Sequence, residues 1–407
     1  MNQTARAFSA RSSYRYVRIP LDSVVNLLLA SRHTFWVTEF NGAGEAVDYA
    51  QEGIRIVLFS RSKGVVGLDI GSSAIKLVEF SDRKGDFHLE RVGVEPLSPE
   101  AIVDGSIMDS SLVVDAVQRL IEQTGVRSNR FATSVSGHSV IIKKIQVPAM
   151  SADELAESIQ WEAEQYIPFD IHDVRLDYVV LSQGDMGVDT MDVLLVAVKR
   201  DKINDYTSVI SQAGKTPVLV DVDSLALQNA FEHNYEVDPG SVVALVNMGA
   251  SVSNITILTQ GNSVFWRDIS SGGNQFSERL QREFNLSHEQ AEAMKRGQTV
   301  EGQGPADAQP ILDAVSREMA AETQKTFDFF MATTSQSKVE RLYLSGGCAL
   351  TPNLREIFQE KFGVPVELMN PLRRIHYNQG DFHDEWLEAI APTLAIAVGL
   401  AIRKVGD

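Results

Sequence analysis

The first regular pattern in the chain is an apolar run, a short polar turn and a second stretch rich in apolar residues. This stretch, Val65–Phe80, is apolar up to Asp69, passes through Gly71, Ser72 and Ser73, and continues as Ala-Ile-Lys-Leu-Val-Glu-Phe. Apolar runs of this length bounded by glycine and serine are typical of β-strands. The pattern therefore predicts two strands joined by a tight turn.

The same pattern returns later in the chain, in Leu245–Leu258. Asn247 takes the place of Asp69 there, and Gly249 takes the place of Gly71. Two copies of one hairpin in one chain predict two similar half-domains that face each other across a cleft.

The turns have the composition of a phosphate-binding site. Gly71 has no Cβ to block a ligand, so the amides of its turn can point at a phosphate. Asp69 stands where a carboxylate could hold a magnesium ion through water, and Lys76 could bring its ammonium to the same phosphates. For the first segment alone, an ordinary hairpin with a polar turn explains the pattern equally well. The second copy favours the nucleotide cleft.

A third signal lies in Leu342–Leu354. An apolar run ends at Ser345, Gly346 and Gly347 follow, and Thr351-Pro352 introduces a helix. Glycines at this point would let the backbone pass close to a flat ring such as adenine.

The segments between these motifs alternate between strand and helix patterns. The first group comprises a strand over Asp86–Pro96, a helix with the apolar face Leu112, Val113, Ala116, Val117, Leu120 and Ile121 that ends before Gly125, and strands over Phe131–Ser136 and Ser139–Val147. Ser151–Gly214 reads as an inserted module. Ser151 and Glu154 form a capping box that opens a helix through Tyr166, and strands over Val174–Leu181 and Met191–Val198 and a helix over Asp201–Ala213 follow.

Further elements surround the second hairpin. They are the segment Thr216–Phe231 with its helix, helices over Gln275–Phe284 and His288–Arg296, a polar loop over Gly297–Pro310, a long amphipathic helix over Ile311–Phe330, an exposed acidic loop over Ile375–Trp386 and an apolar helix over Pro392–Ile402. Asp221 and Asp223 precede the helix in Thr216–Phe231, and either could face the cleft. Capping of that helix is an equally good explanation of Asp223.

Composition narrows the possible functions. The 407 residues are 44% apolar and 22% charged, which describes a globular protein large enough for two or more domains. The net charge of −17 argues against a nucleic-acid surface and against simple electrostatic attachment to anionic lipid. One cysteine leaves no internal disulfide, and no apolar run of about 18 residues predicts a membrane span.

The chain resembles the actin-like ATPase superfamily and, within it, the PilM family of type IV pilus assembly proteins, relatives of the division protein FtsA. The resemblance rests on Gly67-Leu-Asp-Ile-Gly-Ser-Ser-Ala-Ile-Lys76, Gln165-Tyr-Ile-Pro-Phe-Asp170 and Leu344-Ser-Gly-Gly-Cys-Ala-Leu-Thr-Pro-Asn-Leu354, and covers the chain from about residue 59. It implies an α/β fold of two actin-like half-domains around a nucleotide cleft, with an FtsA-type inserted α-β-β-α subdomain.

The resemblance also implies domain boundaries. The expected parts are an N-terminal extension over 1–58, the first actin-like half over 59–147, the inserted subdomain over 148–214, a return to the first half over 215–240, the second half over 241–275 and 335–390, its upper subdomain over 276–334 and a second connecting helix over 391–407. The extension, which superficially resembles a transit peptide, is expected to be a dispensable tail or upstream sequence joined by a wrongly placed start.

For the site, the resemblance implies ATP with magnesium held at Asp69 through water. The expected nucleotide-binding residues are Asp69, Gly71, Ser72, Ser73, Lys76, Asn247, Gly249, Ala250, Ser251, Gly272, Gly273, Glu292, Lys295, Gly346, Gly347 and Leu350. Glu292 and Lys295 would lie near the ribose and base, although a surface ion pair explains them too. Asp223 would orient the attacking water. Actin-like ATPases generally carry Asp where this chain has Asn247, so we expect ATPase activity that is slow at most.

The implied role is a cytoplasmic scaffold of the inner-membrane pilus platform that binds the N-terminal Asn-Leu-Leu peptide of PilN, without direct membrane insertion or nucleic-acid binding and with possible self-association. Direct anchoring is not expected, because the chain stops at Asp407 without the lipid-binding helix that FtsA-type proteins carry. Two alternatives stay open. One is an FtsA-like, filament-forming division protein, and the other is a small-molecule kinase, which would need a carboxylate base and a sugar-sized pocket.

Overall fold

The computed structural model describes residues 64–404 except 84, 183–188, 239 and 335–337. The expectations for residues 1–58 lie outside the described residues. Within the described part of the chain, no helix is both long and apolar enough to cross a membrane.

The first hairpin belongs to a five-stranded sheet. Its strands are β1 (Val66–Ile70), β2 (Ala74–Arg83), β3 (Asp86–Pro96), β6 (Arg130–Val135) and β10 (Thr216–Val222), in the order β10-β6-β1-β2-β3. The hairpins β1–β2 and β2–β3 are antiparallel, whereas β1–β6 and β6–β10 are parallel. Helix α1 (Ser110–Thr124) packs its apolar side on this sheet.

The second hairpin belongs to a sheet of the same design. Its strands are β11 (Val242–Met248), β12 (Ser253–Thr259), β13 (Asn262–Ile269), β14 (Arg341–Ser345) and β15 (Val366–Leu368), in the order β13-β12-β11-β14-β15. As in the first sheet, the hairpin pairs are antiparallel and the remaining pairs are parallel. The structure therefore confirms the two similar half-domains that the repeated hairpin predicts.

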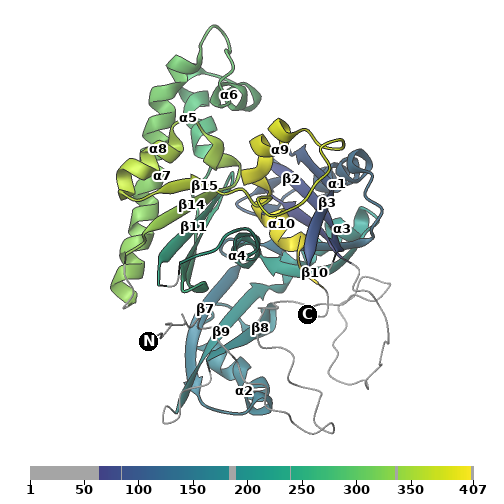
Figure 1. Ribbon diagram of the computed structural model, residues 1–407, viewed down its shortest axis with the longest axis vertical. Helices are drawn as coiled ribbons and strands as arrows, with labels where there is room; N and C mark the ends of the chain where they lie inside the picture. The colour runs from purple at the N-terminus through teal and green to yellow at the C-terminus, as the bar shows by residue number, and fades with distance from the viewer. Residues whose placement is uncertain (1–63, 84, 183–188, 239, 335–337, 405–407) are drawn as a thin grey trace, which may run out of the picture. The chain divides into compact units, whose positions relative to one another are not determined.

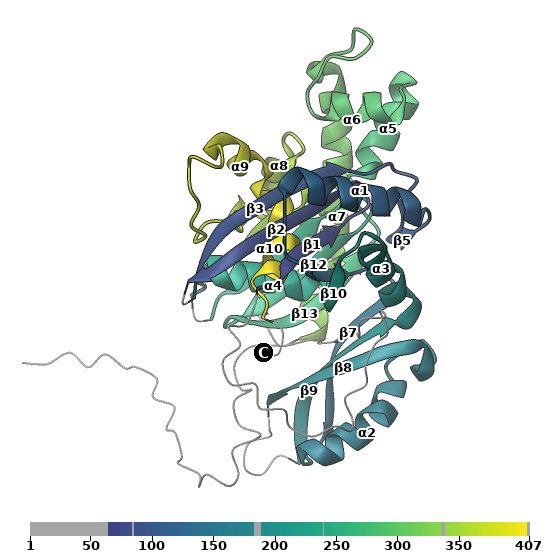
Figure 2. The same cartoon turned by 90° about the vertical axis from the view of Figure 1, so that its right-hand side faces the viewer.

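A separate three-stranded sheet in the order β7-β9-β8 follows the first half. It contains β7 (Val140–Pro148), β8 (Val174–Ser182) and β9 (Thr190–Lys199), with α2 (Ala152–Glu164) packed on one face (Figures 1 and 2). The sequence interpretation gives β7 to the first half, but β7 pairs with β9. Helix α3 (Arg200–Gln212), which the same interpretation gives to the module, buries Tyr206, Val209 and Ile210 in the core of the first half.

Helix ends that follow from local chemistry match their predictions. Ser151 caps α2 in a complete capping box with Glu154, and Gly125 ends α1 in the left-handed conformation. One position of the predicted α1 face is wrong, because Leu112 is 38% exposed. The short elements β4 (Ile102–Val103), β5 (Ser106–Ile107) and η2 (Ile171–Asp173) lie outside the predicted set.

The second half carries a group of helices beside its sheet. They are α5 (Asn274–Phe284), α6 (His288–Lys295), α7 (Pro305–Thr333) and α8 (Leu354–Phe362), with η3 (Gly347–Leu350) before α8. The predicted loop over Gly297–Pro310 is too long, because α7 already starts at Pro305. Proline is favourable at the first helical position, and the Asp307 carboxylate accepts the amide of Gly304 at 2.8 Å. Pro310 is therefore inside the helix, near its N-terminus.

The end of the described chain returns to the first half. Helix α9 (Asp384–Ile390) begins inside the predicted acidic loop, and the predicted apolar helix splits into a 3₁₀ turn η4 (Ala391–Leu394) and α10 (Ala395–Ala401). Helix α10 lies beside α4 (Asp223–Asn234) (Figure 1), in a core that includes residues of both five-stranded sheets. The two helices touch through their backbones, since a Cβ on Gly399 would lie 1.8 Å from the Ala226 carbonyl oxygen.

Candidate functional site

The first hairpin brings its two charged residues together. Asp69 and Lys76 are register partners on β1 and β2, and Lys76 Nζ lies 3.1 Å from Asp69 Oδ2. Gly71, in the turn, donates its amide to the Ala74 carbonyl at 3.2 Å. A Cβ on Gly71 would lie 2.9 Å from Lys76 Nζ, so glycine keeps the space beside the ammonium open. Ser72 and Ser73 complete this turn.

The turn of the second hairpin, which includes Gly249 and Ala250, packs against the backbone of Gly272 and Gly273. Gly273 and Asn274 donate their amides to the carbonyls of Gly249 and Ala250 at 2.9 and 2.8 Å. A Cβ on Gly272 would lie 2.5 Å from the Ala250 carbonyl oxygen, so only glycine allows this approach. The structure thus brings two groups of predicted site residues into contact: Gly249 and Ala250 with Gly272 and Gly273.

Ser251 and Asn247 belong to the same turn region. Ser251 Oγ accepts a hydrogen bond from Asn274 Nδ2 at 3.3 Å. Asn247 is 8% exposed; its Nδ2 donates to Asn254 Oδ1 at 2.9 Å, and its Oδ1 accepts from Ser345 Oγ at 3.2 Å. Asn254 corresponds to Lys76, because each is the hairpin partner seven positions after the polar residue that heads the turn.

Glu292 and Lys295 are more than a surface ion pair. Their side chains are 20% and 14% exposed, and Lys295 Nζ also donates to Ser277 Oγ at 3.1 Å and to the Gly273 carbonyl at 3.3 Å. Burial disfavours the charge of Glu292, but the Lys295 ammonium and the hydrogen bonds outweigh it, so the pKa of Glu292 lies below its usual range. This pair therefore joins α6 to the glycine segment.

The glycines after β14 have different surroundings. Gly346 has φ +86°, donates its amide to Pro392 O at 2.7 Å, and lies so close to β11 that a Cβ would stand 2.3 Å from the Met248 carbonyl oxygen. Backbone packing alone therefore requires glycine at 346. A Cβ on Gly347 would meet no atom within 4 Å, and Leu350 is 41% exposed, so open space lies beside these two residues.

The two aspartates of the connecting segment have different partners. Asp221 is fully buried and pairs with Arg403 at 3.4 Å. Asp223 is the first residue of α4, and its Oδ1 accepts from Ser134 Oγ at 2.6 Å. Burial and the nearby Asp69 carboxylate raise the pKa of Asp223 to about 6. Asp223 does not act as the N-cap of α4, which is Val222.

The carboxylates of the candidate site do not form a complete metal-binding site among the described residues. Among the described residues, no group of three or more His, Cys, Asp and Glu side chains is placed to hold a metal ion. Asp69 and Asp223 are close enough for the charge of one to raise the pKa of the other. An added cation would relieve that repulsion, and magnesium commonly takes one or two carboxylates and keeps several waters.

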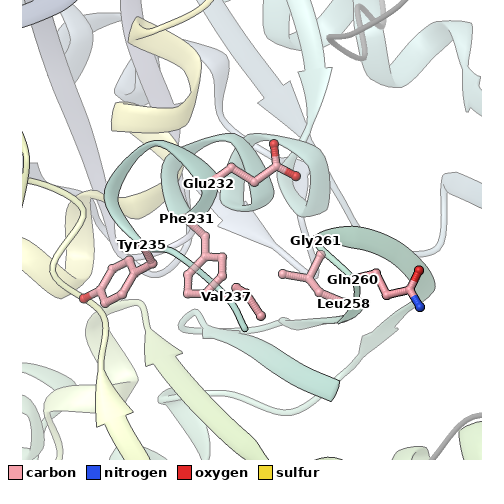
Figure 3. A pocket seen from close by; sticks show the side chains of 7 residues that line it. All are labelled: Phe231, Glu232, Tyr235, Val237, Leu258, Gln260 and Gly261. Carbon is pink, nitrogen blue, oxygen red and sulfur yellow. The ribbon is translucent and has the colours of Figure 1, made fainter. Parts of the chain in front are cut away.

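A separate pocket of about 280 Å³ lies at the other end of α4. It is lined by Phe231, Glu232, Tyr235, Val237, Leu258, Gln260 and Gly261 (Figure 3). None of these residues belongs to the predicted site, which lies toward the start of α4. We therefore base the site on the hairpins and not on this pocket.

The residues that contact the predicted site but were not predicted from the sequence include Ser134 and Asn254, and Asp268 lies beside them as the hydrogen-bond partner of Asn254. Ser134 and Asp268 are distant in sequence from the residues that they contact, and no local motif marks them. Asn254 did have a signal, since its spacing from Asn247 equals that of Lys76 from Asp69.

Comparison with known proteins gives consistent results. A family model described as "Type IV pilus assembly protein PilM" matches residues 67–405. The cell division protein FtsA of Streptococcus pneumoniae is 22% identical over 346 residues, covering 75% of this chain and 75% of FtsA.

Among solved structures, a chain of a PilM–PilN type IV pilus biogenesis complex is 28% identical, with a TM-score of 0.77, and the match covers 85% of this chain and 100% of that one. The ethanolamine utilization protein EutJ of Carboxydothermus hydrogenoformans is 17% identical with a TM-score of 0.52, covering 84% and 89% of the two chains. The second likeness concerns the fold alone.

Proposed function

The chain belongs to the PilM family of type IV pilus assembly proteins, and we propose that it is a nucleotide-binding scaffold that holds the N-terminal tail of a PilN protein. Its fold is actin-like, as the sequence predicts. The scaffold would work at the cytoplasmic face of the inner membrane, attached through its partner. The domain boundaries given above stand as part of this proposal, except that β7 is assigned to the three-stranded sheet and α3 to the first half.

One observation carries the nucleotide part of the proposal. Equivalent hairpins in two equivalent sheets hold polar residues at equivalent positions, Asp69 with Lys76 and Asn247 with Asn254. Lys76 would contact the terminal phosphates, while the turn amides after Gly71 and Gly249 would contact the phosphate chain. Glu292 and Lys295 would lie near the ribose and base, and Gly347 and Leu350 near the adenine.

The residues present fit magnesium. Asp69 would hold the ion through water, and Asp223 and the oxygen of Asn247 would accept hydrogen bonds from that water. The ion would supply positive charge to the phosphates. We propose that hydrolysis is slow at most, because Asn247 provides an acceptor oxygen without the negative charge of aspartate.

The PilN part of the proposal rests on family membership and on the likeness to a chain of a PilM–PilN complex. We place the peptide on the surface of the three-stranded module near Trp161–Ile171, which covers the end of α2 and the segment that follows it. Trp161 is 74% exposed on α2, and the rings of Tyr166 and Phe169 are covered by Lys143 and Lys199 at 4.7 and 4.3 Å. The exposed indole of Trp161 is an apolar surface that suits the leucines of an Asn-Leu-Leu tail.

Calorimetry with magnesium and ATP tests the nucleotide part. Asp69→Ala and Lys76→Ala should each weaken MgATP binding about 10-fold or more, because each removes a charged contact. Lys76→Ala should affect ATP more than AMP, because the ammonium is assigned to the terminal phosphates. The matched control is Asp86→Ala, because Asp86 is an exposed carboxylate at the start of β3. Equal affinities in wild type and Asp69→Ala would remove Asp69 from the site.

Pull-down with a peptide that begins Asn-Leu-Leu tests the partner. We expect capture by the wild-type protein and reduced capture by Trp161→Ala. The 22% identity to FtsA favours a filament-forming division protein as the second candidate. Absence of peptide capture together with ATP-dependent pelleting would support that candidate.

A further inference from the structure

Four polar side chains form a row across the second sheet. Ser345 on β14 is the register partner of Asn247 on β11, Asn247 is the partner of Asn254 on β12, and Asn254 is the partner of Asp268 on β13. Ser345, Asn247 and Asn254 are buried at 0%, 8% and 1% exposure. We refer to these four residues as the polar row.

The hydrogen bonds of the polar row have one direction. Asn254 Nδ2 donates to Asp268 Oδ1 at 2.9 Å, Asn247 Nδ2 donates to Asn254 Oδ1 at 2.9 Å, and Ser345 Oγ donates to Asn247 Oδ1 at 3.2 Å. An ionised carboxylate can only accept hydrogen bonds, whereas an amide has one accepting and one donating side. Asp268 therefore determines which way both asparagine amides face.

Asp268 has a second acceptor oxygen, and this oxygen contacts the first half. Oδ2 accepts the amide of Gly137 at 2.7 Å, in the loop between β6 and β7. The next residue, His138, has Nε2 3.0 Å from Ser270 Oγ. Ser136, just before Gly137, bonds the Asp223 carboxylate. One carboxylate thus meets both the second hairpin and the loop that supports Asp223.

We infer that Asp268 is a positioning residue for the proposed nucleotide site. It acts through Asn254 to fix the direction of the Asn247 amide, so that the Asn247 oxygen, which accepts from Ser345, keeps its second lone pair for a ligand while the amino group is held by Asn254. This inference rests on the proposed function. The ligand side would be a water bound to the nucleotide's metal ion, which donates hydrogen bonds and needs an acceptor. If the hydrogen bonds of the polar row ran the other way, the amino group of Asn247 would face that water. Both groups are donors, so no hydrogen bond would form between them.

A charge swap within the polar row tests this inference. Asp268→Asn leaves one acceptor oxygen where Gly137 and Asn254 each need one. Either the Gly137 amide then loses its acceptor, or the side-chain amides of Asn254 and Asn247 both flip by 180°. Asn254→Asp places two carboxylates side by side. The double variant restores the direction, because the amide introduced at position 268 would donate to the carboxylate introduced at position 254, which would also accept from Asn247. The oxygen of the new amide would still accept from Gly137, and the net charge equals that of the wild type.

We expect each single variant to weaken MgATP binding about 10-fold and the double variant to return within about 3-fold of wild type. AMP binding without magnesium should stay unchanged in all three variants, since a merely structural defect would weaken both ligands. Asp86→Asn is the matched control for the change of charge. The inference would be overturned if the double variant bound MgATP no more tightly than the single variant with the lower affinity. It would also be overturned if the variants lost equal factors of affinity for ATP and for AMP.

A second measurement separates this inference from the proposed function. Each single variant should melt at least about 4 °C below wild type and the double variant within about 2 °C of it, with no nucleotide present. Failure of wild type to bind MgATP would overturn the proposed function and the role of the row in it. If the loss of melting temperature in the double variant equalled the sum of the losses in the two single variants, the inferred direction of the hydrogen bonds in the polar row would be wrong, whatever the nucleotide result.

Discussion

Asn247 is the residue at which the second hairpin departs from the aspartate that the actin-like resemblance leads us to expect. Its amide donates to Asn254 and accepts from Ser345, so both sides of the side chain are engaged. Phosphoryl transfer depends on positioned charge, and loss of one such group costs about 10²–10³ in rate. On the proposed function, the uncharged residue would allow nucleotide binding while lowering turnover.

We predict that wild type releases phosphate from MgATP barely above background and that Asn247→Asp raises the rate. The same change should lower the melting temperature, because a new acceptor oxygen would face Asn254 Oδ1 inside the sheet. Steady-state phosphate release measures the first effect and thermal unfolding the second. Brisk wild-type turnover that Asp223→Ala abolishes would contradict this and give the catalytic role to Asp223.

Asp223 makes stability depend on pH. Its folded-state pKa is about 6, against 3.8 for a free aspartate, so the folded protein holds this proton more tightly than the unfolded chain. The resulting stabilisation is fully present below about pH 4 and is lost as the pH rises through about 6. At neutral pH the ionised side chain is therefore a destabilising group retained in the proposed site.

We predict that Asp223→Asn is more stable than wild type at pH 7.5 by about 1–2 kcal/mol. This is less than the whole pKa shift would give, because Asp223, although largely buried, keeps part of its surface in contact with solvent. The difference should shrink toward pH 4.5. Urea unfolding at several pH values measures it, with Asp86→Asn as the control. A variant that is less stable than wild type at pH 7.5 would show that the Ser134 hydrogen bond outweighs the cost of burial.

The site residues that sequence could predict are those fixed by the hairpin geometry. Asp69 and Lys76 must face each other once β1 and β2 pair, and Glu292 and Lys295 share a face of α6. Asp268 could not be predicted in this way. Its role depends on the pairing of β12 with β13 and on a loop more than 100 residues away, and neither has a local signal.

At the scale of elements, the contact between α4 and α10 depends on the absence of a side chain. A Cβ on Gly399 would lie 1.8 Å from the Ala226 carbonyl oxygen, and a Cβ on Gly67 would lie 2.0 Å from the Ala397 oxygen. Helix α10 is thus pressed between α4 and β1, backbone against backbone. Neither approach tolerates a methyl group without movement of a helix.

We predict that Gly399→Ala lowers the free energy of unfolding by about 3 kcal/mol, because the clash is with backbone that cannot rotate away. Gly64→Ala is the matched control, since its Cβ would meet only an ordinary contact of 3.5 Å. Urea unfolding of both variants measures the difference. A loss in Gly399→Ala no larger than in Gly64→Ala would mean that α10 moves freely relative to α4.

Elements were predictable where capping chemistry or a turn fixes their ends, as at Ser151 and Gly125. The start of α7 was not, because Pro305–Pro310 is polar and contains two prolines, and the helix is held there by Gly304 and Asp307. The sheet to which β7 belongs also escaped prediction, since its apolar pattern is the same whichever strand it pairs with.

At the scale of the whole molecule, the loop between β6 and β7 is the meeting point of three parts. Ser134, near the end of β6, and Ser136, at the start of the loop, bond Asp223, and Gly137 donates its amide to Asp268 of the second half. Strand β7 then enters the three-stranded sheet at Val140. A ligand that draws the two halves together would order this loop and the strand that follows it. The proposed nucleotide and peptide sites would then share one ordered segment.

We predict that MgATP tightens binding of the Asn-Leu-Leu peptide about 5-fold or more, and that the peptide tightens MgATP by the same factor, because coupling between two sites is reciprocal. Calorimetric titration of each ligand, with and without saturating amounts of the other, measures both factors. His138→Ala removes the contact with Ser270 and should reduce the coupling while leaving peptide affinity without nucleotide unchanged. Equal peptide affinities with and without MgATP would show that the loop transmits nothing between the cleft and the three-stranded sheet.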